Sequence, residues 1–141
     1  MRGFFDQNDG NPKVEIEISG TTSGLTKKII ALFDTGHNGT LSLPIFDLIE
    51  IGAKLRGCQP VSYASGYVSV VYLFGVNVIV DGIEKEVYAS MIENPTATEA
   101  IAGLQLFAPY ISLINFKEKT IIFATEEELR RLESSRASRQ K

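Results

Sequence analysis

Strict alternation of apolar and polar residues near the start of this 141-residue chain limits its fold more than any other feature. Val14, Ile16 and Ile18 alternate with Glu15, Glu17 and Ser19. A period of two is typical of a β-strand with one buried and one solvated face. The sequence therefore predicts a mainly β fold.

More β-prone runs follow, separated by short turn signals. Ser65-Gly66 and Asp81-Gly82 are pairs suited to tight hairpins. Pro44 is expected to open a short helix over 45–51, which Gly52 ends. The other predicted strands cover 27–33, 40–43, 61–64, 67–73, 76–80, 86–92, 111–116 and 120–123.

Length and composition favour one domain. The chain has the commonest size of a single domain, and 44% hydrophobic residues with 22% charged residues is ordinary for a globular protein. We assign residues 1–124 to this domain and residues 125–141 to a tail. In the tail, Thr125 and Glu128 form a capping-box pattern that predicts a surface helix to about Glu133. A disordered basic end over 134–141 is expected after it.

A carboxylate on a tight turn is the sharpest candidate for chemistry. Asp34-Thr35-Gly36 follows the apolar run 29–33, so Asp34 stands at the end of a predicted buried strand. A carboxylate placed in this way can exchange a proton with a reacting group. No second Asp-Thr-Gly or Asp-Ser-Gly occurs in the chain.

A second segment makes the pattern more specific. Residues 100–107 read Ala-Ile-Ala-Gly-Leu-Gln-Leu-Phe, with small and apolar residues before Gly103 and a helix-like run after it. With Asp34-Thr35-Gly36, this order resembles the retropepsin-like family, the single-lobe aspartic proteases of retroviral type. The resemblance covers roughly 13–123, and residues 33–44 look most like the bacterial, especially cyanobacterial, branch.

The resemblance implies a closed acid-protease barrel of one lobe, with one or two short helices. It also implies an aspartic endopeptidase whose two catalytic carboxylates act as a pair. Because the chain supplies only Asp34, the pair would form across a homodimer, with a peptide or protein as substrate. The implied supporting groups are Thr35 and Gly36 at the catalytic turn, Ser65, Gly66 and Tyr67 in a flap that binds substrate, and Ala102 and Gly103 packed behind the site.

Each of these residues also has a simpler interpretation. Asp34 could merely cap a turn, Thr35 could bond its own backbone, and Gly36 could only supply a positive φ angle. His37 stands where viral members usually have Ala or Ser. We expect it to be a rim or surface residue rather than a catalyst, although a protonated His37 could favour ionised Asp34.

Other classes of function find little support. A net charge near −3 gives no reason to expect nucleic acid. Cys58 and His37 are the only cysteine and histidine, so no zinc site of the Cys/His type is expected, nor any other cofactor or metal. No stretch predicts a membrane span or a secretory signal, so the expected location is cytoplasmic.

Two alternatives to the protease remain. One keeps the fold and the dimer but without catalysis, as a module for peptide binding or assembly. The other is an unrelated β-barrel binding module, which would leave the pairing of Asp34-Thr35-Gly36 with Ala102-Gly103 unexplained.

Overall fold

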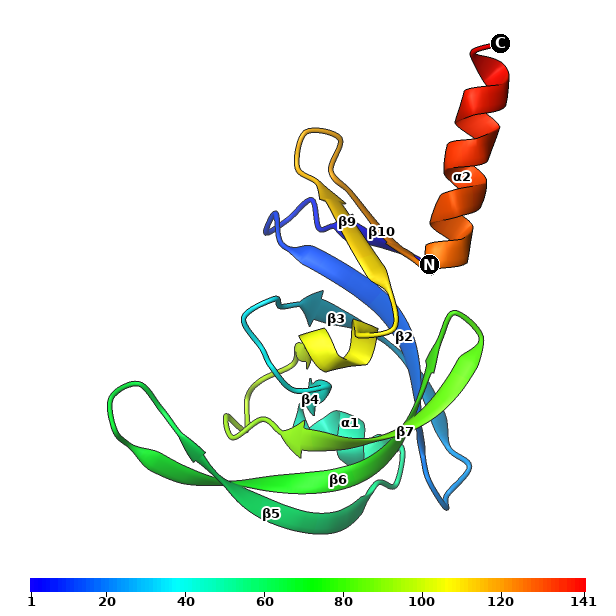
Figure 1. Ribbon diagram of the computed structural model, residues 1–141. Helices are drawn as coiled ribbons and strands as arrows, with labels where there is room; N and C mark the ends of the chain where they lie inside the picture. The colour runs from blue at the N-terminus through cyan, green and yellow to red at the C-terminus, as the bar shows by residue number, and fades with distance from the viewer.

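A computed structural model describes all residues, 1–141, and strands make up 48% of them against 17% in helices. The fold is therefore mainly β, as predicted (Figure 1). In chain order the elements are β1 (Arg2–Phe5), β2 (Pro12–Gly20), β3 (Thr26–Phe33), β4 (Leu41–Leu43), α1 (Ile45–Glu50), β5 (Lys54–Ser62), β6 (Val68–Val80), β7 (Ile83–Met91), β8 (Ala100–Ala102), the 3₁₀ turn η1 (Leu104–Phe107), β9 (Ile111–Asn115), β10 (Thr120–Ala124) and α2 (Glu126–Arg139).

Six of the strands close into a barrel in the order β6-β7-β4-β8-β3-β2. The closing contact joins the end of β2 to β6, where Ile18 pairs with Val78. The first half of β2 pairs on the same side with β1, which continues into β10 and β9. The single-lobe barrel expected from the sequence is confirmed.

The alternating residues of β2 explain why the barrel forms. Val14, Ile16 and Ile18 are all buried, and they belong to one core cluster of 21 residues. A fully buried aliphatic side chain stabilises a fold by about 1.5–3 kcal/mol relative to an exposed one. Three phenylalanines, Phe33, Phe107 and Phe123, pack together and tie β3, η1 and β10 to this core.

The two predicted hairpin turns are present. Asp81 and Gly82 both have positive φ angles, 54° and 78°, which is the geometry of a type I′ turn joining β6 to β7. Gly66 has a φ of 82° in the turn between β5 and β6. The β5–β6 hairpin projects from the barrel at the lower left of Figure 1.

The C-terminal helix begins as predicted and ends later. Thr125 accepts a hydrogen bond from the Glu128 backbone, while Glu128 bonds back to Thr125, so the capping box is present. The helix continues to Arg139, so the prediction of disorder from Ser134 is wrong for most of that segment. Ion pairs four residues apart lie in the first turns of the helix, and the hydroxyls of Ser134, Ser135 and Ser138 donate to preceding carbonyls in the later turns. No residue of α2 is buried.

Candidate functional site

Asp34 begins a tight turn directly after β3. Its backbone N–H donates to the Ala102 carbonyl at 3.1 Å, and its carbonyl accepts from the His37 N–H at 3.2 Å. The Gly36 N–H donates to Asp34 Oδ1 at 2.8 Å, which fixes the direction of the carboxylate. Oδ2 accepts no hydrogen bond within the chain, so it is available to a water or a substrate. Thr35 and Gly36 are exposed beside it.

The segment predicted to pack behind this turn does so. β8 runs parallel to β3, with Ala102 paired to Phe33, the residue before Asp34. A Cβ atom on Gly103 would lie 2.2 Å from the Gly39 carbonyl oxygen and 2.5 Å from the His37 ring, distances that no side chain tolerates. Gly103 is therefore the residue type that allows η1 to approach the loop after Asp34 this closely.

Backbone hydrogen bonds join the start of η1 to the loop after Asp34. Gly103 N–H donates to Thr40 at 2.9 Å, Leu104 N–H to His37 at 2.9 Å and Gln105 N–H to Gly39 at 3.2 Å. Three consecutive donors thus hold residues 37–40 in place. Backbone hydrogen bonds to residues 102–105 therefore fix both Asp34 and the loop that follows it.

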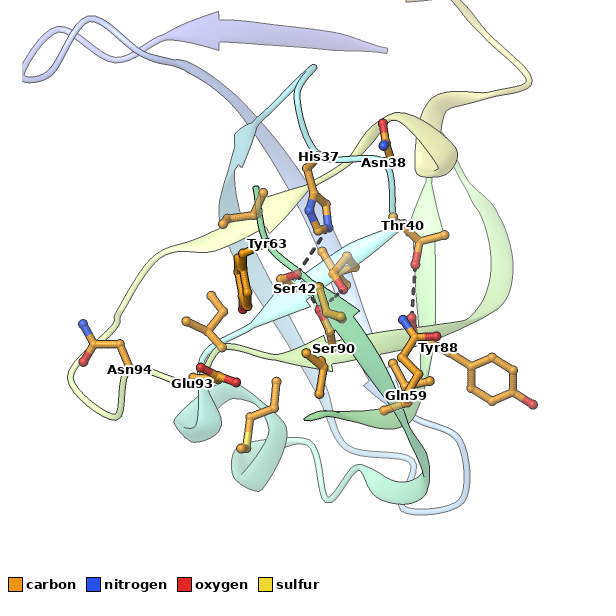
Figure 2. Close-up of a pocket in the computed structure, with 18 residues that line it drawn as sticks. His37, Asn38, Thr40, Ser42, Gln59, Tyr63, Tyr88, Ser90, Glu93 and Asn94 are labelled. Atoms are coloured by element: carbon orange, nitrogen blue, oxygen red, sulfur yellow. Dashed lines mark hydrogen bonds between the residues drawn. The ribbon is translucent and has the colours of Figure 1, made fainter. Parts of the chain in front are cut away.

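A cavity of about 600 Å³ lies between this loop and the β5–β6 hairpin (Figure 2). The first residue in the chain that lines this cavity is His37, three residues after Asp34. Asp34, Thr35 and Gly36 are not among the lining residues. The lining residues come from the loop after Asp34, β4, the hairpin, the end of β7 with the loop after it, and β8: His37, Asn38, Gly39, Thr40, Leu41, Ser42, Gln59, Val61, Tyr63, Val71, Leu73, Tyr88, Ser90, Met91, Ile92, Glu93, Asn94 and Ile101.

The predicted flap residues form the tip of the hairpin. Tyr63 N–H donates to Tyr67 at 2.8 Å and Gly66 N–H to Tyr63 at 2.9 Å, closing a tight turn that contains Ser65. Ser65, Gly66 and Tyr67 do not line the cavity, and Tyr63 is the tip residue that does. The sequence pair Ser65-Gly66 identified the turn but not the residue that points inward.

Three polar side chains in mutual contact line one part of the cavity, and the sequence analysis did not identify them as a group. His37 Nε2 lies 3.3 Å from Ser42 Oγ, and Ser42 Oγ lies 2.5 Å from Ser90 Oγ. Figure 2 shows the His37 ring directed toward Ser42. His37 is half-buried here rather than on the outer surface. No local pattern pointed to Ser90, because the parallel pairing of β4 with β7 brings it to Ser42.

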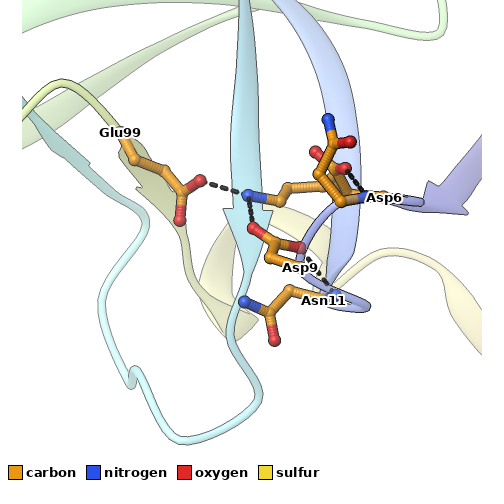
Figure 3. Close-up of polar contacts among 6 residues, drawn as sticks. Asp6, Asp9, Asn11 and Glu99 are labelled. Atoms are coloured by element: carbon orange, nitrogen blue, oxygen red, sulfur yellow. Dashed lines mark hydrogen bonds and ion pairs between the residues drawn. The ribbon is translucent and has the colours of Figure 1, made fainter.

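A buried lysine joins the turn between β1 and β2 to the segment before β8 (Figure 3). Lys13, with a side chain only 4% exposed, pairs with Asp9 at 3.0 Å and with Glu99, the residue before β8. Burial alone would lower the pKa of Lys13, but its hydrogen bonds to Glu99 and Asp9 outweigh burial and raise it. Since Lys13 pairs along the sheet with Leu32, the network lies beside β3, the strand that precedes Asp34.

The chain offers one candidate catalytic carboxylate and no metal cluster. Asp34 makes no hydrogen bond to a second carboxyl group. No group of three or more His, Cys, Asp or Glu residues is arranged to hold a metal ion. None of the helices is both long and apolar enough to cross a membrane. The sequence matches no protein-family model and no curated protein.

Proposed function

We propose that this protein is a homodimeric aspartic endopeptidase of the retropepsin-like type, acting in the cytoplasm on extended peptide segments. One observation carries the proposal. The Asp34 carboxylate is held by the Gly36 N–H on a turn braced by Ala102 and Gly103, next to a cavity covered by a hairpin. A carboxylate with one fixed and one free oxygen is suited to bind a water.

The chemistry requires a second carboxyl group, for which a second copy of the chain is the source. One Asp34, ionised, would take a proton from water as the water oxygen attacks the peptide carbonyl carbon. The partner copy's carboxyl group, protonated, would donate to the carbonyl oxygen as negative charge develops there. Return of a proton to the amide nitrogen lets the C–N bond break, and the pair is left sharing one proton.

A free sheet edge supports the dimer. β9 is the last strand of the sheet, so its outer backbone groups have no partner within the chain. Residues 111–115 contain no charge and no proline, and Ile111 and Leu113 are 41% and 48% exposed. An uncharged, exposed edge strand is a template for pairing with another strand. Pairing of two β9 strands about a two-fold axis would join two sheets.

The decisive experiment measures cleavage of an unfolded polypeptide by the purified protein from acid to neutral pH. Asp34→Asn has nearly the same shape and removes the acid, so we expect its cleavage rate to fall by about 10²–10⁴-fold. Its thermal unfolding and oligomeric state should stay close to those of the natural protein. Cleavage that persists undiminished in Asp34→Asn rules out the proposed mechanism.

A second candidate function, peptide binding without catalysis, is favoured by the position of the cavity. The cavity is lined by eighteen residues but by none of Asp34, Thr35 and Gly36, so a peptide could occupy it independently of the acid. This candidate predicts that labelled peptides bind the natural protein and Asp34→Asn equally, and that neither cleaves them. A titration with a transition-state mimic separates the two, since such mimics bind an assembled catalytic site far more tightly than substrates do.

A further inference from the structure

The cavity under the β5–β6 hairpin contains a single acidic residue and no basic counterpart. Glu93 is the only Asp or Glu among its lining residues, and none of them is Lys or Arg. Every ion pair of the chain lies elsewhere, so the Glu93 carboxylate has no cation partner. Glu93 lines the cavity but is itself exposed, so its carboxylate is accessible to the charged end of a side chain that enters the cavity from solvent. Opposite charges attract one another more strongly where the bound side chain displaces water from between them.

A hydrogen bond from the hairpin orients this carboxylate. The Ser69 hydroxyl of β6 donates to Glu93 Oε1, which joins the hairpin to the loop after β7. Oε2 accepts no hydrogen bond from the chain, so one oxygen remains for a ligand. Figure 2 shows Glu93 at the side of the cavity opposite Gln59 and Tyr88.

The remaining walls suit a long aliphatic stem. Half of the lining residues are hydrophobic, among them Val61, Val71, Leu73, Met91 and Ile92. The other polar lining groups are uncharged hydroxyls and amides, with the exception of the His37 ring. Lysine and arginine side chains combine a flexible apolar stem with a cationic head, which fits apolar walls that end at a carboxylate.

We propose that this cavity binds a lysine or arginine side chain of the peptide substrate, with Glu93 as its ion partner. The inference rests on the proposed function for the peptide nature of the ligand. It adds a preference for basic residues, because an acidic side chain at the same position would meet the charge of Glu93. A neutral aliphatic side chain would contact the apolar lining residues but leave the Glu93 carboxylate without an ion partner.

Binding to the Asp34→Asn protein tests the preference without cleavage. Labelled decapeptides of Ala, Val and Thr would carry one lysine, arginine, norleucine or glutamate at each position in turn, with fluorescence anisotropy measured at pH 7.5. At one position we expect lysine and arginine peptides to bind about tenfold more tightly than the norleucine peptide. In the Asp34→Asn protein, a further Glu93→Gln substitution should abolish that difference in affinity. A Glu93→Lys substitution there should instead make the glutamate peptide bind more tightly than the lysine peptide.

Glu84→Gln is the matched control, because Glu84 is an exposed carboxylate near the β6–β7 turn and outside the cavity. It should leave the preference unchanged. Equal binding of lysine and norleucine peptides, or a lysine preference that survives Glu93→Gln, would overturn the assignment of the cavity. If selective binding is found but the natural protein cleaves none of the peptides, the cavity assignment stands and the proposed protease activity fails.

Discussion

Single residues of the carboxylate turn show what the sequence could and could not predict. Asp34 could be recognised because the apolar run before it and the turn residues after it are its neighbours in the chain. Gly103 could be recognised only through the family resemblance, because the contacts that require a glycine there come from Gly39 and His37. His37, Ser42 and Ser90 could not be recognised as a group. Ser90 meets Ser42 through the pairing of two strands far apart in sequence, and no local pattern encodes that pairing.

Gly103 provides a direct test of the packing behind the turn. Gly103→Ala places a Cβ atom against the Gly39 carbonyl and the His37 ring, so backbone atoms must move. We expect a loss of about 1–3 kcal/mol in the free energy of unfolding, measured by urea denaturation, together with lower cleavage activity. Gly57→Ala is the control, because a Cβ atom there meets nothing within 4 Å. Equal stability of the two variants would contradict the tight packing.

The Lys13 network predicts a stability that depends on pH. Asp9 accepts hydrogen bonds from the Asn11 backbone and from Lys13, and these lower the pKa of its carboxyl group. A lowered pKa in the folded state contributes stability above the unfolded value of about 3.9, and this contribution is lost as pH falls through the folded value. Asp9→Asn should therefore be less stable than the natural protein at pH 7 but nearly equal to it at pH 2.

Urea denaturation at both pH values would measure this convergence. Glu86→Gln serves as the control, since Glu86 is exposed and forms no ion pair, and it should change stability little at either pH. If the difference in the free energy of unfolding between Asp9→Asn and the natural protein stays constant from pH 7 to pH 2, the charge of the Asp9 carboxylate does not contribute to stability.

At the scale of elements, turns and alternation were predictable and long-range partners were not. Gly66 and Asp81-Gly82 identified hairpins because a positive φ angle is a local requirement of a tight turn. β1 was not foreseen, because its residues Arg2–Phe5 are too few to show a period and their strand exists through pairing with β2 and β10. Lys13 lies beside the apolar positions of β2, yet its burial depends on carboxylates from two other segments.

The free edge of β9 gives a prediction for assembly. Leu113→Lys would place two like charges near one another if β9 strands pair about a two-fold axis, and like charges across strands are destabilising. We expect the dissociation constant of the dimer to rise by about tenfold or more, measured by analytical ultracentrifugation. Ile49→Lys, at an exposed position of α1, should leave it unchanged. If Leu113→Lys leaves the dissociation constant of the dimer unchanged, the interface lies elsewhere than at β9.

For the whole molecule, the proposal requires that two chains share one site. Replacing increasing shares of the natural protein by Asp34→Asn at constant total concentration, after time for subunit exchange, should reduce activity as the square of the natural fraction. Independent monomers would instead lose activity in simple proportion. Activity per chain should also fall on dilution, since dimers dissociate by mass action. A proportional loss in the mixing assay would contradict a shared pair of carboxylates.

The strand β6 belongs both to the hairpin and to the barrel, and this has a mechanical consequence. Its first residues pair only with β5, whereas Leu73–Val80 are clamped between neighbours inside the barrel. β6 is a continuous strand of thirteen residues, roughly 40 Å long, and only its C-terminal part is held inside the barrel. A load on the hairpin tip is thus transmitted to the barrel wall, and bending should concentrate at the irregular step between Leu55 and Gly57 in β5.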